Sequence, residues 1–180
     1  GKIMKLFKNL INQPDLEWVS IDGTHIRAHQ SSSGNKKEQA IERSAGGLSS
    51  KIHLIVDAHG NPIDYLITNG TTHDVKVAPD LIELIDLTET KIVNADKGYD
   101  SEKLRDLISK TGARANIPRK NKSLQGNYHM DWHIYKSRHV VENAFARLKH
   151  FRAIATRYDK LKNSFSSSVA LACAYIWLKL

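Results

Sequence analysis

Three acidic residues stand where the chain could build a site for phosphate chemistry. Asp22 and Asp96 each end a strand-like run, and Glu142 lies within a segment of helical periodicity. Sites in α/β sheets gather at the carboxyl ends of strands, and hard divalent cations prefer carboxylate oxygens. Two such ions, about 3.5–4 Å apart, promote phosphodiester cleavage in many nucleases. The three carboxylates therefore predict a site for Mg²⁺ or Mn²⁺, with two ions.

The helical segment, expected from about His133 to Phe151, carries further polar groups beside Glu142. Four of its residues share one face: Tyr135, Arg138, Glu142 and Lys149. At about 100° per residue they fall within a sector about 60° wide, at the border of the apolar stripe. Arg152 extends this row if the helix continues. A carboxylate flanked by a phenol and cations suits phosphate binding.

Each of these residues also has a plainer interpretation. Arg138 and Glu142 are four residues apart, the spacing of a common surface ion pair on a helix. Asp22 is compatible with a turn, and Asp96 with a cap for the turn that follows. Their joint order along the chain favours the functional interpretation.

The elements that would position these residues indicate an α/β fold with a mixed sheet. Three antiparallel strands are expected first: 17–29, interrupted at Gly23, and a hairpin of 51–57 and 63–68. Residues 30–48 read as a long loop. Later strands are separated by helices, which implies parallel crossovers. These later elements are a helix at 75–86, a strand at 91–95, a helix at 101–110, a strand at 113–117, the long helix, and a final helix from about 161.

Polar residues outside the acidic set have several interpretations. His25 and His29 lie four apart on a strand, where that spacing separates them, which argues against a zinc site. His53 is expected on the outer surface of the hairpin. Asp74 is interpreted as a helix cap, with a supporting role near the site as the alternative. Two aromatic residues near the basic loop 119–131 are candidates for stacking on bases: Tyr128 and Trp132.

Charge is unevenly distributed along this chain of net charge +8. Residues 1–96 carry a net charge of −3, whereas residues 97–162 carry +10. A basic half beside an acidic one indicates a protein that binds phosphates around a metal site. The alternative is an ordinary basic surface. Besides the helix residues, four cations are predicted to contact DNA: Lys97, Arg119, Lys120 and Lys122.

Composition narrows the class of protein further. The single cysteine, Cys173, excludes an internal disulfide and argues against a cysteine-rich zinc site. It favours a reducing, cytoplasmic compartment. The apolar stretch 169–180 has about 12 residues, too few to span a bilayer, so no membrane partner is expected.

These motifs resemble those of the DDE transposases of bacterial insertion sequences, in the branch marked by Tyr-x2-Arg-x3-Glu-x6-Lys. The similarity covers about residues 17–180, which are interpreted as the catalytic domain after a short helical stub at 1–16. The matching segments are, in order, 22–30, 46–53, 57–62, His73-Asp74, 95–100, and 135–149 continued by 151–160.

The resemblance implies an RNase-H-like fold in which Asp22, Asp96 and Glu142 bind the metal. It also implies hydrolysis of phosphodiester bonds at the element's ends, followed by transfer of the freed 3′-OH into target DNA. The implied partners are double-stranded DNA, as terminal inverted repeats and as target, and a second copy of the chain assembled on it. Family members usually carry a further N-terminal region, whereas about twenty residues precede Asp22 here. A remnant that only binds DNA and a nuclease of the same fold are the alternatives.

Overall fold

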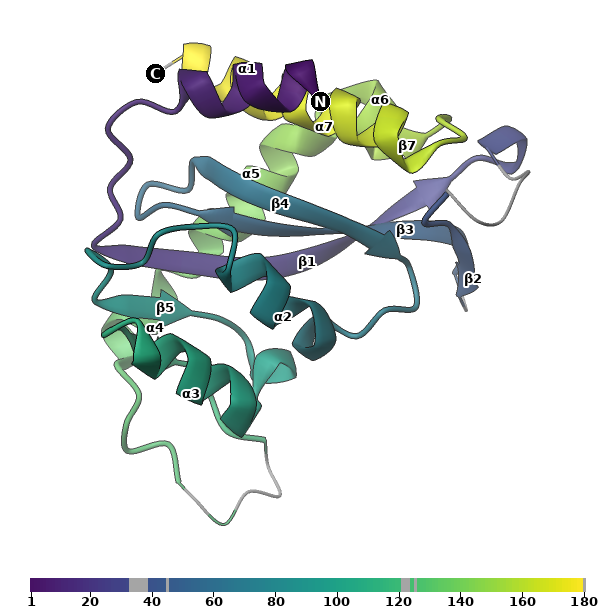
Figure 1. Cartoon of the computed structure of the whole chain (residues 1–180). Coiled ribbons are helices and arrows are strands. Elements are labelled where there is room, and N and C mark those ends of the chain that lie inside the picture. The colour runs from purple at the N-terminus through teal and green to yellow at the C-terminus, as the bar shows by residue number, and fades with distance from the viewer. Residues whose placement is uncertain (33–38, 45, 121–123, 125, 180) are drawn as a thin grey trace.

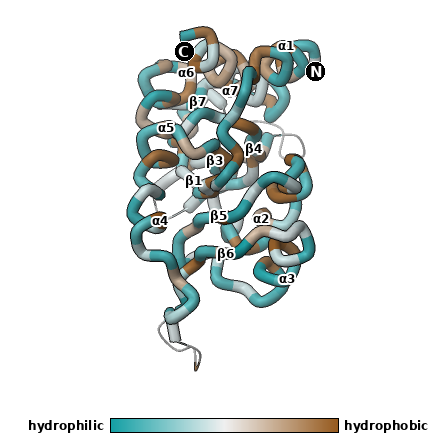
Figure 2. The backbone as a smooth tube through the Cα atoms, turned by 90° about the vertical axis from the view of Figure 1, so that its left-hand side faces the viewer, coloured by the Kyte–Doolittle hydropathy of each residue, from teal (hydrophilic) through white to brown (hydrophobic). Residues whose placement is uncertain are grey.

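A seven-stranded mixed sheet lies between two sets of helices in a computed structural model of the chain (Figures 1 and 2). The structure describes residues 1–32, 39–44, 46–120, 124 and 126–179. Seen edge-on in Figure 2, helix α5 (His139–Lys149) covers one face of the sheet, and helices α2 (Asp74–Ile82) and α3 (Glu102–Lys110) cover the other.

The strand pairing confirms the predicted α/β class and mixed sheet. The strands are β1 (Trp18–Ala28), β2 (Glu42–Ser44), β3 (Gly47–Val56), β4 (Pro62–Asn69), β5 (Ile92–Asn94), β6 (Arg114–Asn116) and β7 (Thr156–Arg157). Antiparallel pairing joins β1, β2 and β4 to β3. Parallel pairing joins β5 and β7 to β1, and β6 to β5. The short strands β2 and β7 have no periodicity, and the sequence did not predict them.

Strand β1 runs through Gly23 without the predicted interruption. It pairs with β3 from Ser20 to Arg27, with Asp22 opposite Leu54 and Gly23 opposite His53. Because this ladder holds the backbone extended, Asp22 lies within a strand and not at the end of one. The side chains of Asp22 and Thr24 consequently share a face of the sheet.

The prediction of one continuous helix at 133–151 is wrong. It forms α4 (Trp132–Lys136) and α5, separated by Ser137 and Arg138. The Ser137 hydroxyl donates to the Ile134 carbonyl at 2.6 Å, and Val140 N bonds the Ser137 carbonyl three residues back at 3.0 Å. Such side-chain competition and three-residue spacing tighten the backbone between the two helices.

The second break follows α5. Phe151 is extended, with ψ 116°, so Arg152 begins a separate helix, α6 (Arg152–Ala155). The predicted row of residues on one helix face therefore ends at Lys149.

The predicted loop at 30–48 contains a 3₁₀ turn, η1 (Gln30–Ser32), and strand β2, which extends the sheet edge along β3. Within this range, residues 33–38 and 45 lie outside the described residues. A second 3₁₀ turn, η2 (Lys97–Tyr99), follows β5.

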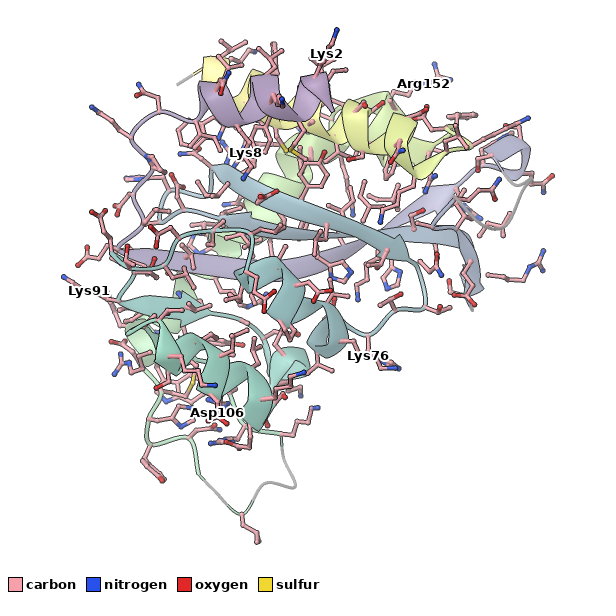
Figure 3. All side chains as sticks on the ribbon, viewed as in Figure 1. Lys2, Lys8, Lys76, Lys91, Asp106 and Arg152 are labelled. Atoms are coloured by element: carbon pink, nitrogen blue, oxygen red, sulfur yellow. The ribbon has the colours of Figure 1, made fainter. Side chains whose placement is uncertain are left out.

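Helices α1 (Lys2–Leu10) and α7 (Lys162–Leu178) lie side by side at one end of the molecule (Figure 1). Phe7 of α1 is fully buried in the main core. Lys8 reaches from α1 to β4 and donates to Asp64 Oδ2 at 2.5 Å (Figure 3). The N-terminal helix is thus packed into the same core as the sheet. Within the described residues, no helix has the length and apolar character needed to cross a membrane.

Candidate active site

Arg138 joins two of the three predicted acidic residues. Its Nη1 lies 3.1 Å from Asp22 Oδ2, and its Nη2 lies 2.8 Å from Glu142 Oε1. The expected ion pair between Arg138 and Glu142 is therefore present, but the same guanidinium also binds a strand far away in the sequence. Carboxylates of β1 and α5 consequently face one positive charge.

Asp96 lies beside this pair, at the start of η2. Its Oδ1 accepts a hydrogen bond from Gly98 N at 2.7 Å, so the capping interpretation is confirmed. Burial raises the pKa of Asp22, and the charges of Asp96 and Asp74 raise it further, whereas the Gly23 amide and Arg138 lower it. The net rise shows that the burial of Asp22, reinforced by two nearby carboxylates, outweighs the Gly23 amide and Arg138.

The guanidinium at the centre of the site stays firmly charged. Burial lowers the pKa of Arg138, but the charges of Asp22 and Glu142 help to outweigh burial and raise that pKa overall. The Tyr135 ring lies 5.9 Å from the guanidinium, close enough for a cation–π contact. Tyr135 thus joins the group although the helix is broken between the two residues.

Lys149 reaches the same face of β1. Its Nζ lies 2.7 Å from Thr24 Oγ1, two residues beyond Asp22 on the strand. Lys97 is exposed directly after Asp96. These two cations flank the carboxylates, as expected for residues that bind phosphates.

Other predicted DNA contacts lie apart from this group. Arg152 projects outward from the start of α6 (Figure 3). Arg119 forms an ion pair with Glu102 of α3 and lies 3.8 Å from Asp100, so it ties its loop to α3. Lys120 is exposed, and Lys122 lies outside the described residues.

The three acidic side chains are chemically suited to a divalent cation. All their donors are carboxylate oxygens, which hard cations prefer, and a cationic guanidinium already lies between two of them. Among the described residues, no three side chains of His, Cys, Asp or Glu stand close enough together to hold one ion as they are. A metal would therefore compete with Arg138 for the carboxylates.

A second polar cluster, missed by the sequence reasoning, lies against the other face of β1. Lys51 Nζ donates to Asp74 Oδ2 at 2.6 Å, and His53 Nδ1 lies 3.2 Å from Asp74 Oδ1. The expected surface position of His53 is wrong, because α2 covers that face and leaves the side chain fully buried. Asp74 also does not cap α2, since the N-cap is His73 and the Asp74 carboxylate turns toward the sheet. Lys51 and His53 alternate with apolar residues on β3, which was the available signal.

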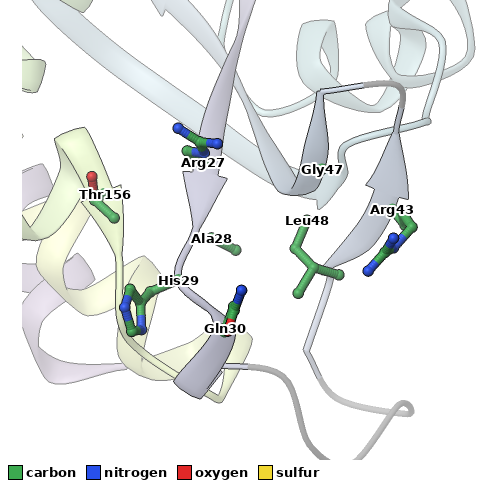
Figure 4. Close-up of a pocket in the computed structure, with 8 residues that line it drawn as sticks. All are labelled: Arg27, Ala28, His29, Gln30, Arg43, Gly47, Leu48 and Thr156. Atoms are coloured by element: carbon green, nitrogen blue, oxygen red, sulfur yellow. The ribbon is translucent and has the colours of Figure 1, made fainter.

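A cavity of about 570 Å³ opens at the far end of β1, where none of the three acidic residues lines it (Figure 4). Two arginines, Arg27 and Arg43, stand on its rim together with His29. The three predicted acidic residues thus lie outside this hollow.

Comparison with known proteins decides the family. A model of the transposase DDE domain matches residues 13–177, nearly the whole chain. The chain belongs to the DDE transposases. A putative transposase for insertion sequence element IS6501 from Brucella ovis is 38% identical over 133 residues, which cover 73% of this chain and all of that protein. A putative transposase for element IS402 from Burkholderia cepacia is 30% identical, over 71% of this chain and 62% of that protein.

Solved structures agree on the fold of this transposase domain. A piggyBac transposase synaptic complex with hairpin DNA matches with a TM-score of 0.50 and 9% identity, over 92% of this chain and 47% of that one. A simian T-cell lymphotropic virus intasome matches with a TM-score of 0.50 and 14% identity, over 88% of this chain and 48% of that one. At such identities the likeness concerns the fold alone, which is the RNase-H-like fold of integrase and transposase catalytic domains.

Proposed function

We propose that this transposase domain cleaves phosphodiester bonds at the ends of a DNA element and joins the freed 3′-OH to target DNA. Asp22, Asp96 and Glu142 are its proposed metal ligands. The observation that carries the proposal is the guanidinium of Arg138, which is bound by carboxylates from β1 and α5 at 3.1 and 2.8 Å. A position that favours one cation between carboxylates suits another cation of higher charge.

Family membership implies dependence on a divalent metal. We propose Mg²⁺ or Mn²⁺, with two ions, because the three acidic residues supply only oxygen donors. Bound ions of this kind polarise the phosphate and stabilise the attacking and leaving oxygens. Arg138, once it releases a carboxylate, has a planar cation free to bind a phosphate oxygen.

The proposed partner is double-stranded DNA, as the terminal inverted repeats of the element and as the target. Lys149, Lys97 and Lys120 are proposed to contact phosphates, because all three are exposed. Tyr135, only partly buried beside Arg138, is proposed to stack on a base or orient a phosphate. A homodimer assembled on DNA is the proposed working form.

The proposal is tested with an end-labelled duplex that carries a terminal repeat, incubated with protein and Mn²⁺. We expect the wild-type protein to nick one strand, and Glu142→Gln to nick at least about 100-fold more slowly, since even residues behind metal ligands are worth 10–100-fold. Asp106→Asn is the matched control, because Asp106 is an exposed carboxylate on α3. A Glu142→Gln protein as fast as wild type would refute the role of this residue.

The two alternatives give different products in the same experiment. A DNA-binding remnant shifts the duplex in a gel but leaves it uncut with Mn²⁺. A nuclease of the same fold cuts the duplex but never joins a 3′ end to a supercoiled target plasmid. Recovery of joined product therefore distinguishes a transposase from both.

A further inference from the structure

We propose that Asp74 is a positioning residue that sets the spacing between Asp22 and Asp96 from the opposite face of the sheet. This inference rests on the proposed function of these two aspartates as metal ligands. It assigns a role to the cluster of Lys51, His53 and Asp74.

The spacing of the two aspartates is not fixed by strand pairing. Strands β1 and β5 pair only through Trp18–Ser20 and Ile92–Asn94. Asp22 and Asp96 each lie two residues beyond the last paired residue of their strand. Along this stretch the described backbone has no β1–β5 ladder to hold the two segments together, so side chains must supply that constraint.

Asp74 contacts the segment that carries Asp22. Gly23 faces the Asp74 carboxylate so closely that an added Cβ would meet Asp74 Oδ1 at 2.4 Å and Lys51 Cε at 2.8 Å. Gly23 is also the register partner of His53. The carboxylate of Asp74 thus occupies the space that a side chain at position 23, next to Asp22, would otherwise fill.

Asp74 also acts on the segment that carries Asp96. Helix α2 packs against the η2 turn, whose first residue follows Asp96 and whose last is Tyr99. Tyr99 is buried; burial and then the charge of Asp74 raise the pKa of its hydroxyl. Asp74 Oδ1 lies 3.2 Å from His53 Nδ1 of β3, and the charge of the same carboxylate acts on the buried Tyr99 hydroxyl of η2. Because Asp74 lies against Gly23 of β1 and its helix packs against η2, shifts of Asp74 bear on both segments at once.

The surroundings of Asp74 suit a fixed charge better than a proton carrier. Burial tends to raise its pKa, but His53 and Lys51 outweigh burial and lower the pKa to about 2. The carboxylate therefore stays ionised at neutral pH. His53 Nε2 is held in turn by Thr68 Oγ1 of β4 at 2.8 Å, so the cluster is anchored on the three strands β1, β3 and β4.

The test compares Mn²⁺ affinity, measured from the EPR signal of free Mn²⁺, for folded wild-type protein and three variants at 25 °C. Asp74→Asn removes the charge but keeps the shape. Gly23→Ala keeps the charge but displaces the carboxylate. Asp80→Asn, an exposed carboxylate on the same helix, is the matched control. We expect the first two to weaken binding roughly 10–100-fold, the range for groups behind metal ligands, and the control to bind as wild type.

A purely structural role gives a different result. Asp74→Asn would then lower the melting temperature while the folded protein bound Mn²⁺ as tightly as wild type, and this outcome overturns the inference. If Asp74→Asn does not fold, Gly23→Ala alone decides, with weakened binding in support and unchanged binding against.

Asp96→Asn separates this inference from the proposed function. If Asp96→Asn binds Mn²⁺ like wild type, the proposed metal site is refuted, and so is the positioning role of Asp74. Should Asp96→Asn lose Mn²⁺ while Asp74→Asn and Gly23→Ala keep it, only the positioning role is wrong.

Discussion

At the site, the effect of the surroundings on a carboxylate is clearest in the raised pKa of Asp22. It is the residue whose pKa rises through burial and through the neighbouring charges of Asp96 and Asp74, despite a bond to Arg138. A carboxylate whose folded-state pKa lies above its unfolded value costs stability once both states are ionised. The ionised Asp22 thus costs stability, chiefly because it is buried and further because Asp96 and Asp74 lie near it.

Asp22→Asn is therefore expected to raise the melting temperature of the metal-free protein at pH 7. The sign follows from linkage: below the unfolded pKa of about 4, both states hold the proton and the cost vanishes. The gain from Asn should shrink as pH falls toward that value. Thermal unfolding followed by circular dichroism from pH 7 to pH 4 measures it. A variant no more stable than wild type at pH 7 would contradict this assignment of charge.

Helix α1 packs into the same core as the sheet. Phe7 is fully buried, whereas the neighbouring Leu6 is 48% exposed. Lys8 further joins α1 to Asp64 of β4, so the helix is bound to the sheet by packing and by charge. This packing goes beyond the helical stub expected from the sequence.

Phe7→Ala should lower the free energy of unfolding by about 3–5 kcal/mol, because it leaves a cavity in the core. Leu6→Ala is the control and should change it by no more than about 0.5 kcal/mol. Urea unfolding at 25 °C measures both. Equal effects of the two substitutions would mean that α1 does not contribute to the core.

The elements with strong periodicity were predictable, and the special positions between them were not. The alternation of Ile52, Leu54 and Val56 marked β3 as a strand with two distinct faces. It gave no sign that α2 would cover the polar face, so His53 was expected at the surface. At the break between α4 and α5 the Ser137 hydroxyl bonds the Ile134 carbonyl, a contact that no periodic pattern reveals.

The sequence was enough to propose the residues of the candidate site, but not the contacts between them. The order of Asp22, Asp96 and Glu142 was readable because each lies on or beside a recognisable element. That Arg138 would bind two carboxylates depends on tertiary contact between β1 and α5. Asp74 was interpreted first as a cap, with a supporting role near the site as the alternative, since the sequence does not show which strand its carboxylate meets.

The molecule as a whole combines an acidic first half with a strongly basic stretch at 97–162. Figure 2 shows that α5 and α3 lie on opposite faces of the sheet. Lys149 lies on α5 and Lys103 lies on α3, and both are exposed. If DNA approaches the face that carries Arg138 and Glu142, then of these two lysines only Lys149 contacts phosphates.

DNA affinity should accordingly fall steeply with salt, with a slope of log K against log salt of about −0.9 for each phosphate contacted. Lys149→Gln should reduce the size of that slope by about 0.9, whereas Lys103→Gln should leave it unchanged. Fluorescence anisotropy of a labelled duplex between about 50 and 200 mM salt measures both. A larger effect for Lys103 would place the DNA on the other face.

We propose above all that carboxylates from β1, the end of β5 and α5 form one metal site. Mn²⁺ titration of the wild-type protein and of Asp22→Asn, Asp96→Asn and Glu142→Gln, followed by EPR, tests it most directly. We expect saturable binding to the wild type, and a loss of at least about 10-fold in affinity for each of the three variants. Wild-type affinity in any one of them would contradict the claim.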